Sequence, residues 1–314
     1  MERKGTWKTY IRIMRLDHWI KQLFVLPGIA FALFMIPAEK LSGHVSDLIF
    51  GFLSTCLIAS ANYVINEWLD RSFDRFHPEK KHRSIVENGA DPRVVYSLYA
   101  VLTILGLFLA SRVNMIFLGM ECWLWVMGVL YNVRPFRLKD IPFVDVLSES
   151  VNNAIRLLIG WFMITETYLP PVSLLMGYWF AGAFLMATKR FSEYRMINDP
   201  ERAGLYRKSF RYYTQKSLLL SAFFYAMCAV FFLGIFLIKY SINLLLMMPF
   251  LVGLFCYYFW MSFRQDSAAQ KPEKLITDKG LMLYVAFLIV LFIILLKADV
   301  PFLGMFSVTE MITI

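Results

Sequence analysis

Residues 46–74, SDLIFGFLSTCLIASANYVINEWLDRSFD, join a long apolar run to a polar ending. The apolar run over 46–69 is long enough to cross a hydrocarbon core about 30 Å thick, which takes about 20 helical residues. The ending places Asn66, Asp70 and Asp74 four residues apart, so they share one face of a helix. This stretch therefore predicts a membrane-spanning helix that carries a cluster of oxygen donors at one end.

Similar apolar runs recur along the whole chain. Hydrophobic residues make up 59% of the 314 and charged residues only 18%, well below the roughly one-quarter of a soluble domain. The composition predicts an all-α integral membrane protein with a single domain over 1–314 and no separate soluble domain. Nine spans are expected, the first of them a retained helix rather than a cleaved signal, at about 19–37, 46–69, 92–112, 113–131, 145–164, 170–188, 217–238, 241–263 and 281–297.

The distribution of Lys and Arg predicts the orientation. The first 21 residues and the long connections at 70–93, 132–144, 189–216 and 264–280 together carry 27 of the 32 cations. The positive-inside rule then places the N-terminus and these connections in the cytoplasm, and an odd number of spans places the C-terminus outside. The net charge of +9 reflects this asymmetry, so nucleic acid is not expected as a partner. The four cysteines lie in apolar runs without metal-binding spacing, which argues against zinc or disulfides.

The polar ending of the second span suits a divalent cation. Asn66, Glu67, Asp70 and Asp74 offer the oxygen ligands that Mg²⁺ prefers, with water and substrate phosphate completing its shell. Cations that follow would hold the phosphate, namely Arg71, Arg75, Lys80, Lys81 and Arg83. The alternative interpretation is a solvated helix end with ordinary ion pairs.

A second polar stripe runs along the fifth span. Asp145, Glu149, Asn152 and Arg156 share one helical face, and Arg156 would lie about 16 Å deep at 1.5 Å per residue. Burying that charge in lipid costs at least ~2.5 kcal/mol, so a polar partner or a water-filled cavity is expected. Glu121 is one possible partner, and a structural Arg–Glu pair between helices is the competing explanation.

Further cations and aromatic residues lie at the ends of the spans. Tyr131 and Lys139 precede the second stripe, and Lys21 follows Trp19. After the sixth span come Lys189, Arg190 and Glu193, which begin the most basic segment of the chain. Phosphate binding by these residues and simple anchoring to an anionic membrane surface both account for the pattern.

These features together resemble the UbiA superfamily of intramembrane prenyltransferases. NExxDxxxD at 66–74 is similar to the first aspartate-rich motif of that family, with Glu67 in place of an aspartate, and RLDHWIKQ at 15–22 is similar to its RPxxWxKN segment without the proline and asparagine. The segment LKDIPFVDV at 138–146 resembles the branch that transfers phosphoribosyl groups to decaprenyl phosphate. In that branch a Lys-Arg-x-x-Glu segment, here Lys189 to Glu193, replaces a second aspartate-rich motif.

The resemblance implies a central cavity that faces the cytoplasm of a bacterial-type inner membrane. It also implies Mg²⁺-dependent transfer of 5-phosphoribosyl from phosphoribosyl pyrophosphate to a polyprenyl phosphate, for synthesis of cell-envelope glycan precursors. Asp70, Asp74, Asp145 and Arg156 would be catalytic. The substrate-binding residues would be Lys21, Asn66, Glu67, Lys80, Arg83, Tyr131, Lys139, Glu149, Lys189, Arg190 and Glu193.

Two other functions remain open at this point. One is a prenyl-diphosphate transferase that uses the same first motif on an aromatic or other acceptor. The other is a transporter whose intramembrane charges mark a substrate path. A transporter gives no reason for the spacing of Asn66, Asp70 and Asp74 beside phosphate-type cations.

Overall fold

The computed structural model describes residues 5–41, 44–77, 80–197, 199–264, 275, 277–298 and 300–303. The regular secondary structure of these residues is entirely helical, which confirms the expected all-α class. The helices form two compact units. The first comprises Met1–Pro170 and Glu193–Ser217, and the second comprises Pro171–Ser192 and Leu218–Ile314. The single domain over 1–314 stays a prediction.

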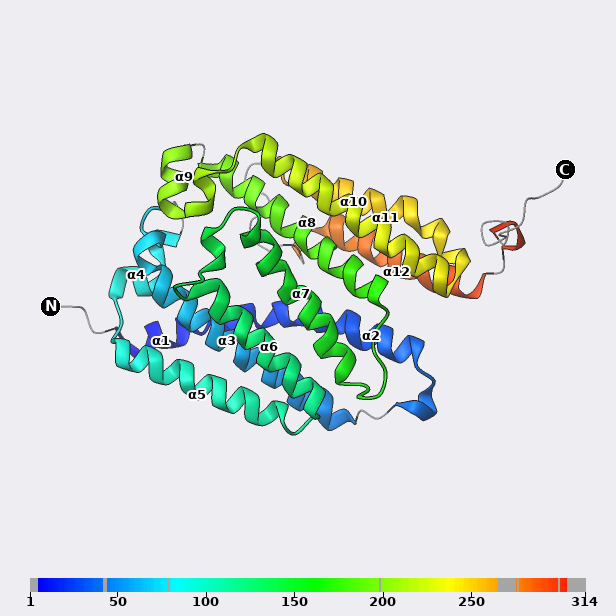
Figure 1. Ribbon diagram of the computed structural model, residues 1–314, viewed down its shortest axis with the longest axis horizontal. Helices are drawn as coiled ribbons and strands as arrows, with labels where there is room; N and C mark the ends of the chain where they lie inside the picture. The colour runs from blue at the N-terminus through cyan, green and yellow to red at the C-terminus, as the bar shows by residue number, and fades with distance from the viewer. Residues whose placement is uncertain are drawn as a thin grey trace. The chain divides into compact units, whose positions relative to one another are not determined.

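The first unit contains most of the elements and all of the polar motifs except Lys189 and Arg190. Figure 1 shows its long helices α3, α5 and α6 running side by side. In chain order its elements are α1 (Trp7–Ile13), η1 (Leu16–Val25), α2 (Leu26–Met35), η2 (Ala38–Lys40), α3 (Val45–Asp74), η3 (Lys80–His82), α4 (Ser84–Asn88), α5 (Pro92–Ala110), α6 (Met115–Asn132), η4 (Leu138–Asp140), α7 (Val144–Phe162), α9 (Pro200–Tyr206) and η5 (Lys208–Arg211).

The first span is not one continuous α-helix. A 3-10 segment, η1, leads into α2, and Pro27 lies in the first turn of α2. Proline has no backbone N–H to donate to the preceding turn, so an α-helix begins at this position rather than passing through it. The break keeps Arg15, which precedes η1, and Gln22, which lies within it, on a segment distinct from α2.

Helix α3 is the central element of the first unit. Its 30 residues correspond to about 45 Å, longer than a hydrocarbon core of about 30 Å, so the helix extends beyond the apolar run. Apolar side chains of α3, among them Val64, Ile65 and Trp68, pack with Ile85 of α4 and Val95 of α5 in a buried core. This packing holds the polar ending of α3 on a rigid helix rather than on a loop.

Helices α2 and α7 approach each other at backbone distance through two glycines. A Cβ atom on Gly28 would collide with the carbonyl oxygen of Leu157, and one on Gly160 would collide with that of Val25. Small residues permit this kind of close approach between membrane helices. The contact fixes α7, and with it the second polar stripe, against the first span.

The second unit is built from long apolar helices. They are most of α8 (Val172–Ile197), most of α10 (Gln215–Tyr240), η6 (Ile242–Met247), α11 (Met248–Met261) and α12 (Lys279–Lys297). The rings of Phe180 and Phe232 stack at 5.7 Å between α8 and α10. Asn243 donates to the carbonyl of Ala298, 2.6 Å away.

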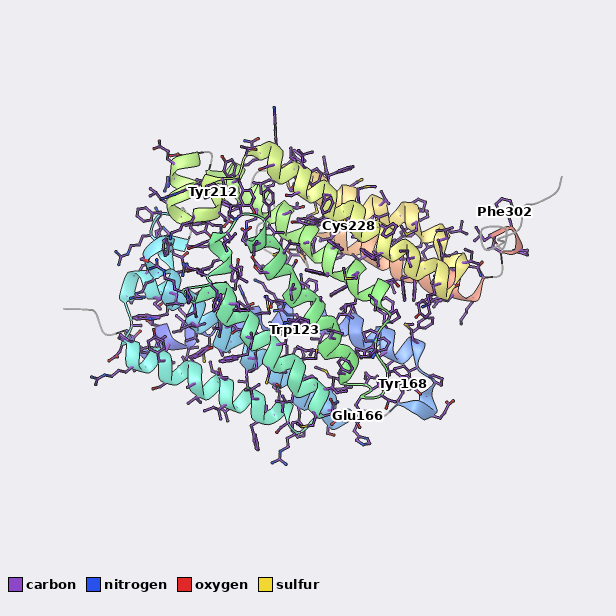
Figure 2. The ribbon with its side chains drawn as sticks, viewed as in Figure 1. Trp123, Glu166, Tyr168, Tyr212, Cys228 and Phe302 are labelled. Carbon is purple, nitrogen blue, oxygen red and sulfur yellow. The ribbon has the colours of Figure 1, made fainter. Side chains whose placement is uncertain are left out.

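Eight helical segments of the described chain are long and apolar enough to cross a membrane. The ninth expected span corresponds to α7, which has 19 residues but carries Asp145, Glu149 and Arg156. Large apolar side chains lie on the outside, as membrane spans require, and Trp123 of α6 is an example labelled in Figure 2. Helix α8 continues nine residues past the predicted end of its span at 188, because hydropathy marks the edge of the membrane and not the end of a helix.

Candidate functional site

The polar residues at the end of α3 divide into two pairs rather than forming one row. Residues on an α-helix are about 100° apart, so Asn66 and Asp70 lie toward one side, and Glu67 and Asp74 toward the other. Asp70 and Asp74 are adjacent across the two pairs. Each pair is held by cations from a different part of the chain, and the site is therefore assembled from distant segments.

The first pair is bound by the segment that follows α6. Asp70 Oδ1 accepts from Arg137 Nη2 at 2.8 Å and lies 2.6 Å from Lys139 Nζ. Asn132, the last residue of α6, connects the group, since its Oδ1 accepts from Asn66 and, at 2.8 Å, from Lys139. Burial lowers the pKa of Lys139 to about 8, although the Asp70 carboxylate acts in the opposite direction.

The second pair is bound by two arginines. Glu67 Oε1 accepts from Arg15 Nη1 at 3.1 Å and lies 3.7 Å from Arg83 Nε. Asp74 Oδ2 accepts from Arg83 Nη1 at 2.8 Å. Burial opposes the charge of Arg83, but Glu67 and Asp74 outweigh it and raise the pKa of that guanidinium. Both carboxylates are nearly inaccessible to solvent.

Two of these arginines have unusual backbone conformations. Arg15 (φ 52°) and Arg137 (φ 36°) both lie in the left-handed region, and each immediately precedes a 3-10 helix. Such a conformation costs a non-glycine residue of order 1–3 kcal/mol and persists where the surroundings enforce it. In both cases the conformation allows the arginine to form an ion pair with a carboxylate of α3.

A second polar cluster lies beside the first. Glu193 Oε1 accepts from Lys80 Nζ at 3.0 Å and from the Tyr206 hydroxyl at 3.1 Å, and His77 Nε2 is 3.3 Å away. Lys80 also donates to the Tyr206 hydroxyl. Burial lowers the pKa of Lys80 and that of His77. Glu193 is therefore surrounded by donors.

The stripe on α7 makes its contacts at three depths. Near its start, Asp145 accepts from the hydroxyls of Tyr213 at 2.5 Å and Ser209 at 3.2 Å. One turn further, Glu149 Oε2 accepts from the Tyr131 hydroxyl at 2.8 Å. The backbone geometry that was expected, one face from Asp145 inward, is present in α7.

The deepest residue of the stripe, Arg156, has neutral partners. Its Nε donates to Gln22 Oε1 at 2.9 Å, and its Nη1 donates to the carbonyl of Asn152 at 3.2 Å. Glu121 instead accepts from the Thr55 hydroxyl at 2.5 Å, so the suggested direct Arg156–Glu121 contact does not occur in the described chain.

The remaining predicted site residues are Lys21, Lys189 and Arg190. Lys21 lies 3.0 Å from Nδ1 of the buried His18. Lys189 and Arg190 belong to the second unit, where they precede Glu193 on α8, and Arg190 is buried. Sequence reasoning did not single out Arg15, Arg137, Asn132 or Arg207 as site residues. Arg15 begins the quoted RLDHWIKQ segment and Arg137 directly precedes LKDIPFVDV, so their position in or beside those motifs was the available signal.

The oxygen donors at the end of α3 fit a magnesium ion. The cation pairs occupy Oδ1 of Asp70 and Oδ2 of Asp74, and the other oxygen of each has no cation partner among the described residues. No described group of three or more His, Cys, Asp and Glu side chains converges on a metal position. Mg²⁺ commonly binds through one or two carboxylates and completes its shell with water and phosphate, which this arrangement allows.

Residues 25–288 match the UbiA prenyltransferase family. The chain belongs to that family. This confirms the resemblance seen in the motifs, and together with the apolar helices it makes the chain a multi-pass membrane protein.

Several relatives differ in what their names say they do. A decaprenyl-phosphate phosphoribosyltransferase of Mycolicibacterium smegmatis is 28% identical over 227 residues, covering 66% of this chain and 63% of the relative. A 4-hydroxybenzoate octaprenyltransferase of Providencia stuartii is 28% identical over 155 residues, covering 49% and 50%. The chain thus spans about half to two thirds of the length of these relatives.

Solved structures agree with the fold. A UbiA homolog from Archaeoglobus fulgidus bound to DMAPP and Mg²⁺ has a TM-score of 0.68 with 19% identity, covering 92% of this chain and all of that chain. The same homolog bound to GPP and Mg²⁺ has a TM-score of 0.67. At this level of identity the likeness shows a shared fold.

Proposed function

We propose that the protein transfers the 5-phosphoribosyl group of phosphoribosyl pyrophosphate to a polyprenyl phosphate of decaprenyl type and releases pyrophosphate. One observation carries the proposal: Asp70 and Asp74 stand at adjacent positions on one helix, and each keeps a carboxylate oxygen that no described cation occupies. Glu193 and Asp145, by contrast, are each enclosed by donors.

One metal position suits a single pyrophosphate group. We assign Asn66, Asp70 and Asp74 to the Mg²⁺ ion, and retain Glu67 as an outer carboxylate that orients Arg15 and Arg83. When bound, the ion would neutralise charge on the leaving pyrophosphate. Three cations would share that task, namely Lys80, Arg83 and Lys139. Each is now in an ion pair with a carboxylate, and each could leave that carboxylate to bind phosphate oxygens.

The reaction itself needs little from acid–base groups. An anionic oxygen of the lipid phosphate attacks C1 of the ribose, and the bond from C1 to the pyrophosphate oxygen breaks with its electron pair. No proton has to be removed from the nucleophile. The chain would therefore act by positioning both substrates and by stabilising negative charge. Glu149 and Tyr131 are suited to ribose hydroxyls, and Arg156 with Gln22 lies deeper along the same face.

The orientation of the chain supports a cytoplasmic site. The first motif and the basic segments lie on the side that the positive-inside rule assigns to the cytoplasm. A phosphorylated sugar donor made in the cytoplasm would reach such a site directly. We accordingly place the protein in a bacterial-type inner membrane with its N-terminus inside.

The proposal can be tested with purified protein. Labelled phosphoribosyl pyrophosphate, Mg²⁺ and polyprenyl phosphates of several lengths should yield labelled lipid and free pyrophosphate. Consumption of a prenyl diphosphate with 4-hydroxybenzoate, without use of phosphoribosyl pyrophosphate, would instead favour the reaction named for the Providencia stuartii relative. Release of pyrophosphate in either reaction would exclude a transporter.

A further inference from the structure

Arg207 is a cation at the centre of the first unit's polar residues that no predicted role includes. It lies in extended backbone (φ −139°, ψ 120°) between α9 and η5. Its side chain is 14% exposed. The exposed Tyr212, labelled in Figure 2, marks the outer end of the same short segment. Arg207 itself therefore points inward from a segment whose end is on the surface.

The guanidinium of Arg207 has fewer partners than donors. Nη1 donates to the Tyr131 hydroxyl at 3.3 Å and lies 3.7 Å from Asp145, beyond hydrogen-bond distance. Asp145 already accepts from the nearer hydroxyls of Ser209 and Tyr213. Nε is buried and has no hydrogen-bond partner. An arginine offers five N–H donors, and a buried one left unmet is costly, so the site is incomplete as it stands.

The charges around Arg207 indicate what kind of partner it could bind. Arg207 interacts electrostatically with both Lys139, on the Asp70 side, and Lys80, on the Glu193 side. Lys80 and Lys139 are already in ion pairs with Glu193 and Asp70. Arg207 completes a group of three cations, and the carboxylates that act on it are Glu193 and Asp145, the latter 3.7 Å from Nη1. Such a cluster attracts an additional anion with more than one oxygen.

We propose that Arg207 binds the phosphate monoester of a substrate through two parallel hydrogen bonds, apart from the pyrophosphate group at Asp70 and Asp74. This rests on the proposed function. The planar fork of arginine matches the oxygens of a phosphate, whereas lysine offers a point charge. The Tyr131 hydroxyl orients the fork, since it accepts from Arg207 and donates to Glu149. The monoester belongs either to C5 of the phosphoribosyl donor or to the polyprenyl acceptor.

The substitution Arg207→Lys keeps the positive charge and removes the planar guanidinium that can form two parallel hydrogen bonds. We expect it to raise the KM of one substrate by about 10- to 150-fold, the range given by one charge-assisted hydrogen-bonded group, and to leave kcat nearly unchanged. A higher KM for phosphoribosyl pyrophosphate together with weaker binding of ribose 5-phosphate assigns the C5 phosphate. A higher KM for polyprenyl phosphate with unchanged binding of ribose 5-phosphate assigns the acceptor.

Arg211→Lys is the matched control, because Arg211 is exposed on η5 and has no place in the site. Equal effects of the two substitutions, or unchanged KM values for both substrates in Arg207→Lys, overturn the inference. Binding of inorganic phosphate to the purified protein gives a readout that needs no turnover. If the wild type ignores phosphoribosyl pyrophosphate, the proposed function fails. The role of Arg207 is then decided by phosphate binding alone, and it fails if Arg207→Lys binds inorganic phosphate as tightly as the wild type does.

Discussion

Lys139 Nζ lies 2.6 Å from Asp70 Oδ1, and the two residues are 69 positions apart in the sequence. Asp70 is also bound by Arg137, two residues before Lys139. The short η4 segment thus delivers two cations to one carboxylate of α3. This pairing positions the Asp70 side chain. It also means that the ion pair of Asp70 with Lys139 exists only while that buried lysine is protonated.

Activity is expected to fall as pH rises through about 8. Burial lowers the pKa of Lys139 to about 8, so its charge is lost above that pH together with its capacity to bind phosphate oxygens. Lys139→Arg should keep activity to higher pH, because arginine stays charged. Rates measured between pH 6 and pH 10, roughly, for both proteins check this, and identical profiles would contradict it.

The same lysine has the opposite effect on stability. Its folded pKa lies below the unfolded value, so the unfolded state binds more protons between about 8 and the ordinary value of 10.5. The contribution of Lys139 to the free energy of unfolding should therefore rise with pH across that window. Thermal unfolding in detergent, compared with Lys139→Met over that pH range, measures it. A difference between the two proteins that stays constant would argue against a lowered pKa.

Asp70→Asn and Asp74→Asn should each leave the protein inserted and nearly inactive. Each change removes the charge of a proposed metal ligand and preserves the size of the side chain. Turnover at saturating Mg²⁺, with membrane abundance as the reference, is the measurement. Glu39→Gln serves as the control, since Glu39 is exposed on the short η2 segment, outside the site. Normal turnover in both α3 variants would remove the metal assignment.

Lys189→Ala and Arg190→Ala should weaken the use of phosphoribosyl pyrophosphate or polyprenyl phosphate by about 10- to 150-fold each. Charge-assisted bonds to phosphate are worth roughly 1.5 to 3 kcal/mol, and cations at these positions cannot hold Mg²⁺. Membrane insertion and abundance should stay close to wild type. If the two residues only anchor the helix at the membrane surface, steady-state kinetics of the variants will match the wild type.

Gln22→Leu should destabilise the protein by about 1 to 3 kcal/mol, because it leaves Arg156 Nε without its acceptor inside the membrane. Unfolding of the purified protein in detergent would show the loss. The exposed Gln215, at the start of α10, provides the control Gln215→Leu. Equal stability of Gln22→Leu and wild type would mean that water replaces the Gln22 oxygen.

Reporters fused at two places test the predicted orientation. A reporter in the 264–280 connection should be cytoplasmic and one at the C-terminus external, because 27 of 32 cations fall in segments that the positive-inside rule assigns to the cytoplasm. Most of that connection and the last residues of the chain lie outside the described part, so the test is independent of the structure. Reporters on the same side would mean that the number of spans is even.

The helices were predictable and the ion pairs were not. Hydropathy located α5 (Pro92–Ala110) and α12 (Lys279–Lys297) to within about two residues, because lipid demands an apolar run of fixed length. It could not show that α8 continues to Ile197, since charged residues extend a helix beyond the membrane as readily as they form a loop.

The pairings depend on contacts between distant segments. The spacing of Asn66, Asp70 and Asp74 indicated a shared face. The partners Arg15 and Arg137, however, lie 52 and 67 residues from Glu67 and Asp70, the residues that they bind. Their left-handed backbone conformations could not be predicted either, because neither position carries the glycine that usually indicates a positive φ. A pattern of residue types can thus locate a site without revealing which charge neutralises which.

The glycine contact between α2 and α7 limits how a long lipid can reach the polar stripe. Gly28 and Gly160 bring the two backbones so close that no acyl or prenyl chain can pass between these helices at that level. The contact between α2 and α7 excludes hydrocarbon because backbone atoms meet there, and backbone atoms cannot rotate away as side chains can. Under the proposed function, a polyprenyl tail would therefore approach Arg156 along another flank of α7, because opening the contact would mean parting α7 from the first span.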